Sequence, residues 1–171
     1  ILGIDEAGRG PLAGPVAVGV VCAEEGYDFL AVFPGLNDSK KLSEKKREAL
    51  YELLLAEAKK GNVRAKVCFG SEASIDTKGI APTIRAALAR GIRALAPNPE
   101  GVRVYLDGSL SAPREYTQET IIGGDASVPA IMLASVAAKV ARDRLMRRLA
   151  PPYPDYGVEV HQGAGTKADS A

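Results

Sequence analysis

The chain opens with ILGIDEAGRGPLAGPVAVGVVCA (residues 1–23), in which two apolar runs flank a polar, glycine-rich segment. Residues 1–4 and 15–23 are rich in β-branched side chains and are typical of buried strands. We expect the intervening segment, from Asp5 to Pro11, to form a tight polar connection. Its two adjacent acids, Asp5 and Glu6, are an unusual choice for stability alone, which points to a functional role.

Strand and helix patterns intermix along the rest of the chain. Residues 24–42 carry Pro-Gly and Asn-Asp-Ser turn signals and are expected to form a loop. Apolar residues at helical spacing predict helices over about residues 43–61, 82–96 and 128–149. Alternating or β-branched runs predict strands over about residues 63–69, 102–106 and 119–122. This mixture favours a single α/β domain.

Composition excludes several classes of function. The 171 residues carry 22 Lys and Arg against 21 Asp and Glu, a formal charge of +1, so neither a strongly basic coat nor an acidic tail is present. Cys22 and Cys68 lack metal-ligand spacing and are interpreted as buried thiols, as suits a reducing compartment. No signal peptide or apolar run of membrane-spanning length is visible, and we expect a cytoplasmic protein. The single histidine, His161, has no nucleophile-elbow motif beside it, which disfavours a serine hydrolase.

Acidic residues follow three of the predicted strands. Asp5 and Glu6 follow the first, Asp107 ends another, and Asp125 ends a third. Carboxylates at neighbouring strand ends can converge, and their repulsion raises pKa values unless cations neutralise them. Hard divalent ions with oxygen ligands suit such a cluster, and two ions about 4 Å apart can promote phosphodiester hydrolysis. The alternative is that each acid is an ordinary turn former.

Basic residues gather in three places. Gly8-Arg9-Gly10 combines exposed backbone N–H groups with a guanidinium, a combination that can bind phosphate or simply form a turn. Lys40 and Lys41 lie in a polar loop, where a phosphate contact and a solvated surface are equally open. On the last predicted helix, Arg144, Arg147 and Arg148 are expected to form a solvated face.

These motifs, taken together, resemble bacterial ribonuclease HII. The resemblance begins with GIDEAGRGPLAGPV (residues 3–16) and continues through LNDSKKL (residues 36–42), LDG (residues 106–108) and GD (residues 124–125). It resumes in ASVAAKVARD (residues 134–143) and YPDYG (residues 153–157), so it covers nearly the whole chain in order.

The resemblance implies a ribonuclease H-like fold, in which helices flank a central mixed sheet of five strands. It also implies an endoribonuclease that uses magnesium or manganese to cleave RNA in RNA–DNA hybrids and at ribonucleotides embedded in duplex DNA, leaving 3′-hydroxyl and 5′-phosphate ends. In our hypothesis two ions are bound: Asp5 bridges them, Glu6 and Asp107 complete the sites, and Asp125 holds the second ion near the attacking water.

The resemblance also implies which residues contact the substrate. Gly8, Arg9 and Gly10 are expected to grip the backbone around the ribonucleotide, where the 2′-hydroxyl distinguishes RNA from DNA. Lys40, Ser135 and Lys139 are the expected phosphate contacts. We therefore expect the partner to be an RNA–DNA hybrid or ribonucleotide-containing duplex DNA, with no membrane involved. We also expect the protein to be a monomer.

The chain departs from the family pattern near its C-terminal end. The family usually has His-Lys-Gly-Tyr-Gly-Thr where this chain has His161-Gln162-Gly163-Ala164-Gly165-Thr166, and the replaced tyrosine is associated with stacking on the sugar at the RNA–DNA junction. We expect one catalytic domain over residues 1–171 with a shortened C-terminal helical part, of the family type without an added N-terminal domain. Ala164 and the shorter end favour an alternative, a hybrid-binding module with weakened catalysis, whereas the complete acidic set favours the enzyme. A metal-dependent phosphatase for small substrates is a third possibility.

Overall fold

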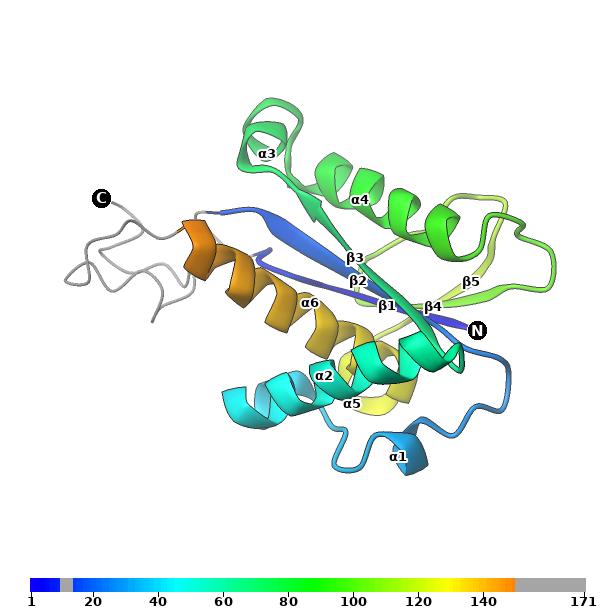
Figure 1. Cartoon of the computed structure of the whole chain (residues 1–171). Coiled ribbons are helices and arrows are strands. Elements are labelled where there is room, and N and C mark those ends of the chain that lie inside the picture. Colours follow the sequence, from blue (N-terminus) through cyan, green and yellow to red (C-terminus); the bar gives the residue numbers. More distant parts are fainter. Residues whose placement is uncertain (10–13, 150–171) are drawn as a thin grey trace.

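Five strands form one mixed sheet. The strands are β1 (Leu2–Ala7), β2 (Val16–Cys22), β3 (Arg64–Gly70), β4 (Arg103–Asp107) and β5 (Thr117–Ile121). In the computed structural model, which describes residues 1–9 and 14–149, they lie in the order β3-β2-β1-β4-β5 (Figure 1). The β1–β2 and β2–β3 pairs are antiparallel, whereas β1–β4 and β4–β5 are parallel. The expected α/β class and the mixed five-stranded sheet are confirmed.

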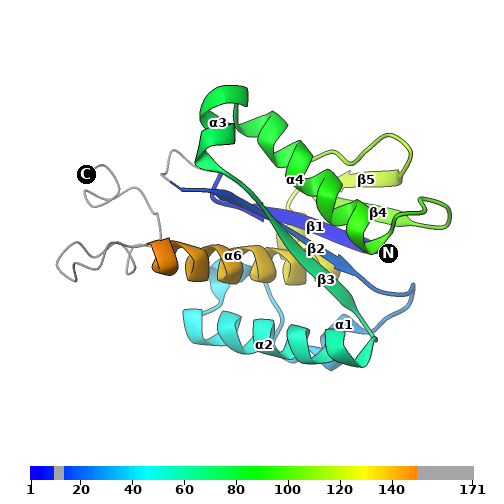
Figure 2. The same ribbon diagram turned by 45° about the horizontal axis from the view of Figure 1, so that its top comes forward.

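Helices cover both faces of this sheet. The helical elements are α1 (Phe29–Val32), η1 (Ser39–Lys41), α2 (Glu44–Lys60), α3 (Glu72–Lys78), α4 (Ile80–Leu95), α5 (Gly124–Ser127) and α6 (Pro129–Leu149). Figure 2 shows α3 and α4 on one face and α6 on the other, with α1 and α2 outside α6. The apolar residues divide in the same way, into one buried cluster between the sheet and α4 and a second around α6, α2 and α1.

Helix α6 lies directly against β1 and β2 because these strands carry glycines where it crosses. A Cβ added at Gly3 would lie 2.3 Å from the backbone carbon of Ala130, and one at Gly19 would lie 2.2 Å from the carbonyl oxygen of Ala134. The facing positions of α6 are themselves small, so helix backbone and sheet backbone approach closely. This contact brings the middle of α6 to the same sheet face as the side chain of Asp5, since residues 3 and 5 of a strand share a face.

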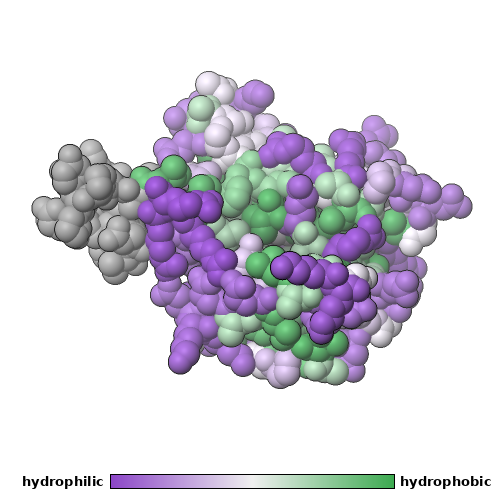
Figure 3. Space-filling model, viewed as in Figure 1, coloured by the Kyte–Doolittle hydropathy of each residue, from purple (hydrophilic) through white to green (hydrophobic). Residues whose placement is uncertain are grey.

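The outer surface of α6 is held to α2 by ion pairs. The guanidinium of Arg144 bonds to Glu48 and, at 2.7 Å, to Glu52, while Arg147 pairs with Glu44 and, at 3.7 Å, with Glu48. Figure 3 shows the hydrophilic side chains along these two helices. The expected solvated face is therefore wrong for Arg144 and Arg147, because the acids of α2 lie opposite them.

Several boundaries differ from those predicted. β1 continues through Ala7, so Asp5 and Glu6 lie within the strand; backbone pairing of Ala7 with Ala17 in β2 does not depend on side-chain polarity. α4 begins at Ile80, which places Pro82 within the first turn, where its missing N–H has no helical acceptor to lose. β5 runs from Thr117 to Ile121 and is mostly exposed, which left it without a clear hydrophobic pattern.

The short helices were not predicted at all. The segment expected as a loop contains α1 and η1, and α3 and α5 have no counterpart among the predicted elements. α1, η1 and α5 have four residues or fewer, and α3 has seven, so none of them develops a helical repeat of apolar residues. Among the described residues, no helix has the combination of length and hydrophobicity that crossing a membrane demands.

Candidate metal centre

Asp5 is buried in β1 on the face that α6 covers. Its side chain belongs to a residue that is only 4% exposed, and it pairs across the ladder with Gly19. One carboxylate oxygen, Oδ1, accepts a hydrogen bond of 2.8 Å from the backbone N–H of Glu6. Burial, with a smaller contribution from the charges of Glu6 and Asp107, raises the pKa of Asp5 from 3.8 to about 8. Asp5 therefore holds a proton at neutral pH unless a cation replaces it.

Asp107 is brought beside Asp5 by parallel pairing. β4 lies next to β1 with Ile4 opposite Leu106, so the residues that follow, Asp5 and Asp107, emerge at the same edge of the sheet. Such an edge, where parallel strands reach their carboxyl ends, is a common place for a site in α/β proteins.

Asp125 does not end a strand, as the sequence had suggested, but lies in the one-turn helix α5. β5 ends at Ile121, and Gly123, with φ of 68°, turns the chain back toward the sheet. The backbone N–H of Asp125 then donates a 3.1 Å hydrogen bond to Oδ1 of Asp107. A left-handed residue followed by a single helical turn is hard to foresee, because it has no periodicity.

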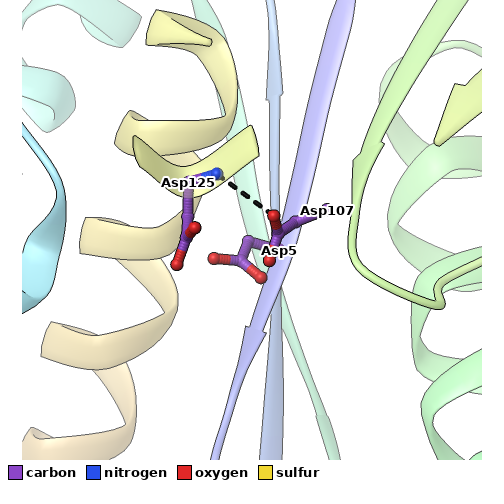
Figure 4. Close-up of side chains that lie close together, drawn as sticks. All are labelled: Asp5, Asp107 and Asp125. Atoms are coloured by element: carbon purple, nitrogen blue, oxygen red, sulfur yellow. Dashed lines mark hydrogen bonds between the residues drawn. The ribbon is translucent and has the colours of Figure 1, made fainter. Parts of the chain in front are cut away.

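The three aspartates converge on one point. Each offers a carboxylate oxygen within 4.8 Å of those of the other two, with the side chains coming from β1, β4 and α5 (Figure 4). Three carboxyl oxygens at this spacing suit a hard divalent cation such as Mg²⁺ or Mn²⁺. Such a cation would replace the proton that burial keeps on Asp5. The donor set fits the metal that the sequence implies.

Glu6 lies beside the three aspartates, outside the group whose oxygens all lie within 4.8 Å of one another. The Cβ atoms of Asp5 and Glu6 leave the strand on opposite faces, yet the two carboxyl groups lie close enough for a hydrogen bond between their side chains. Burial raises the pKa of Glu6, whereas the hydrogen bond to the Asp5 side chain and then the charge of Arg9 lower it; the charge of Asp107 raises it further. The expectation that Asp5 and Glu6 lie in a polar connection is wrong, since both lie within β1, whereas Glu6 as a fourth metal ligand stays a prediction.

Lys40 is the cation nearest to the cluster that the ion pairs of the described residues record. Its Nζ lies 3.5 Å from Oδ2 of Asp125, although the side chain is 74% exposed. η1 presents it through an N-cap, since Asp38 accepts a 3.0 Å bond from the backbone N–H of Lys40. The charge of Asp125, followed by that of Asp38, raises the pKa of Lys40, so it stays protonated. An exposed ammonium at the rim of an acidic cluster is well placed to meet a phosphate.

The two predicted contacts on α6 lie in different surroundings. Ser135 is buried, and its hydroxyl lies 2.8 Å from that of Ser39 in η1; the Ser135 side chain also lowers the pKa of Asp5. Lys139 is 40% exposed, with Nζ 3.6 Å from Oδ1 of the buried Asp143 one turn further on. Ser135 thus lies under the carboxylates, whereas Lys139 is open to a ligand.

Two residues near the site were not singled out from the sequence. Ser39 belongs to the Asn-Asp-Ser turn signal and to the LNDSKKL motif, and its position next to Lys40 is what could have indicated a place near the site. Arg142 is 3% exposed and contacts Gly8 and Pro15, which no pattern within α6 could reveal. Gly8 and Arg9 lie directly after β1, whereas the predicted contact Gly10 and the divergent segment from His161 to Thr166, with Ala164, lie outside the described residues.

Comparison with known proteins agrees with this geometry. A family model for ribonuclease HII matches residues 2–171. Ribonuclease HII of Geobacillus kaustophilus is 44% identical over 167 residues, covering 97% of this chain and 60% of that protein. Ribonuclease HII of Coxiella burnetii is 43% identical over 172 residues, covering 100% of this chain and 80% of that protein. The solved complex of PCNA with ribonuclease HII from Archaeoglobus fulgidus matches with a TM-score of 0.72 and 26% identity, covering 98% of this chain and 82% of that chain.

The sheet order, the helices on both faces and the carboxylates at the ends of β1 and β4 define a ribonuclease H-like fold, as expected. Within that class, the chain belongs to the ribonuclease HII family. It spans less than two thirds of the Geobacillus relative's length and four fifths of the Coxiella relative's. The family resemblance drawn from the sequence motifs is confirmed.

Proposed function

We propose that this chain is a metal-dependent endoribonuclease that cleaves the RNA strand of RNA–DNA hybrids and cuts at ribonucleotides embedded in duplex DNA. The observation that carries the proposal is the convergence of Asp5, Asp107 and Asp125 within 4.8 Å in a chain of the ribonuclease HII family. Hydrolysis forms a bond from phosphorus to the water oxygen and breaks the bond from phosphorus to O3′, which leaves a 3′-hydroxyl and a 5′-phosphate.

The acidic residues are the metal ligands in this proposal. Asp5, Asp107 and Asp125 hold two Mg²⁺ or Mn²⁺ ions, with Glu6 as a further ligand from the edge of the cluster. When bound, the ions supply an activated water and stabilise the leaving oxygen. The hydrogen bond from the N–H of Asp125 to Asp107 fixes the orientation of that carboxylate before any ligand arrives. No side chain is required to act as a general base.

The cationic and hydroxyl groups around the cluster hold the nucleic acid. Lys40 faces the substrate from η1 and neutralises charge on the phosphate to be cut, with Lys139 contacting the backbone along α6. Ser135 supports the site from beneath, and Gly8, Arg9 and Gly10 grip the strand at the ribonucleotide. Lysines beside a metal cluster favour a polymeric phosphodiester over a small phosphate ester.

The decisive experiment is incision of a labelled DNA duplex that contains one ribonucleotide. With Mg²⁺ we expect a single cut at the ribonucleotide; with EDTA, or with an all-DNA duplex, we expect none. Asp125→Asn should lower the rate by about 100-fold or more, because it removes one ligand charge. Asp76→Asn, at an exposed position of α3, is the matched control and should cut at the parent rate.

Two outcomes would contradict this function. Tight binding of the duplex without metal-dependent incision would support the hybrid-binding alternative. Hydrolysis of a small phosphate ester that an excess of duplex fails to inhibit would support the phosphatase alternative. The single catalytic domain over residues 1–171, the monomeric state and the cytoplasmic location stay predictions.

A further inference from the structure

A buried guanidinium lies against the described residues on both sides of positions 10–13. Arg142 of α6 is 3% exposed, and its Nε donates a 2.8 Å hydrogen bond to the carbonyl oxygen of Pro15. Burying a charged group destabilises a protein unless hydrogen bonds and opposite charge compensate it. The neighbouring Asp143, also buried, supplies part of the opposite charge. Arg142 therefore occupies a specific site, unlike the exposed Arg148 on the same helix.

The same guanidinium fills the space that a side chain at Gly8 would need. A Cβ added there would lie 2.1 Å from Nε and 2.8 Å from Cδ of Arg142. Gly14 has a similar relation to α6, since its Cβ would lie 2.7 Å from Sδ of Met146 and 3.3 Å from NH2 of Arg142. Both glycines also have positive φ, 90° and 107°. The backbone at both positions therefore lies directly against side chains of α6, with no room for a Cβ.

We propose that Arg142 is a positioning residue that fixes Gly8 and Arg9, and through them the recognition of the ribonucleotide. This inference rests on the proposed function, in which Gly8 and Arg9 contact the substrate. Arg142 itself is too buried to reach a nucleic acid, so it acts through the backbone that it packs against. The planar guanidinium packs on Gly8 while bonding to Pro15, and a lysine ammonium lacks the fork that does both.

The first test substitutes Arg142 conservatively. Arg142→Lys keeps the charge, and we expect its KM for a duplex with one ribonucleotide to rise about tenfold or more, from the loss of a buried charged hydrogen bond. We expect kcat at saturating substrate to change by less than about threefold, because the three aspartates are untouched. Mn²⁺ affinity measured by calorimetry should equal that of the parent chain. Arg148→Lys is the control and should leave KM unchanged. An unchanged KM in Arg142→Lys, or a fall in kcat with KM unchanged, would overturn the positioning role.

A second measurement does not depend on activity. Hydrogen exchange of the backbone amides of residues 7–9, 14 and 16 should quicken by about tenfold or more in Arg142→Lys, while exchange in β4 stays unchanged. If these amides exchange at the parent rate, the role is refuted whatever the kinetics show. Should the parent chain fail to cut the duplex, the proposed function fails, and the exchange result still decides whether Arg142 holds this segment.

Gly8→Ala covers the case in which Arg142→Lys does not fold, and a double-mutant cycle applies when both variants fold. Gly8→Ala alone should raise KM, because the new methyl group displaces the guanidinium. When both substitutions fold, their effects on KM should combine to less than their product, because each disturbs the same contact. Strictly multiplicative effects, or a Gly8→Ala chain with the parent KM, would contradict the inference.

Discussion

At the scale of single residues, the buried position of Asp5 has a thermodynamic consequence. Its pKa is about 8 in the folded chain and 3.8 in the unfolded one, so the unfolded state releases the proton first as pH rises. This group therefore destabilises the metal-free protein progressively between about pH 4 and pH 8, and its effect levels off above the folded-state pKa. A divalent cation removes the penalty by taking the place of the proton.

Replacing Asp5 with Asn tests this balance. We expect Asp5→Asn to abolish incision and yet to raise the Tm of the metal-free protein, since an amide has no charge to desolvate and can still accept the bond from Glu6. The increase should be small near pH 4 and reach several degrees by pH 8, at about 2–4 °C per kcal/mol for a chain of this size. Thermal unfolding in EDTA across this range measures it. A difference in Tm that does not change with pH would refute the argument; Asp76→Asn should show no difference.

At the scale of elements, the placement of the site depends on how α6 meets the sheet. Gly19 lies opposite Asp5 in the β1–β2 ladder, and its Cα also faces the carbonyl group of Ala134 in α6, the residue before Ser135. Gly19 therefore determines both how closely α6 approaches the sheet and what surrounds the Asp5 carboxylate. Interiors packed this closely respond to a single added methyl group.

Gly19→Ala should accordingly push α6 outward. The added Cβ would lie 2.2 Å from the Ala134 oxygen, so we expect a loss of about 1–3 kcal/mol in the free energy of unfolding in urea. Incision should weaken as well, because Ser135 moves with the helix. Gly101→Ala is the control: its Cβ meets nothing within 4 Å, and only the strain of a φ of 74° applies. Equal losses in the two variants would show that packing against α6 is not the cause.

The elements also show which features the sequence could predict. β2, α2 and α6 followed from runs and repeats of apolar residues, and Asp107 and Asp125 were correctly placed near Asp5. That Asp5 and Glu6 lie within β1 was not predicted, because nothing in a polar, glycine-rich segment indicates that the strand continues through it. Arg142 could not be recognised as buried, since nothing within α6 reveals that two glycines far away in sequence leave room for it.

At the scale of the whole molecule, the formal charge of +1 hides how the charges are distributed. Arg144 and Arg147 are engaged with the acids of α2, and the three aspartates of the cluster lie together at one edge of the sheet. Lys40 beside the cluster and Lys139 on α6, by contrast, keep a large part of their side chains exposed. Lys40 is thus a cation placed at the acidic cluster itself, although the chain is nearly neutral in total.

This distribution predicts a shallow salt dependence of duplex binding. If Arg9, Lys40 and Lys139 supply the phosphate contacts, the slope of log K against log salt should be about −3, measured with Ca²⁺ to prevent cutting. Lys40→Ala should reduce the magnitude of that slope by about 1, because one fewer counterion is released, while the free energy of unfolding changes by less than about 0.5 kcal/mol because the Lys40 side chain is largely exposed. Lys78→Ala, at an exposed site on α3, should leave the slope unchanged. A slope near −8 would show that cations beyond this set bind the backbone, and an unchanged slope in Lys40→Ala would mean that Lys40 serves Asp125 and not the substrate.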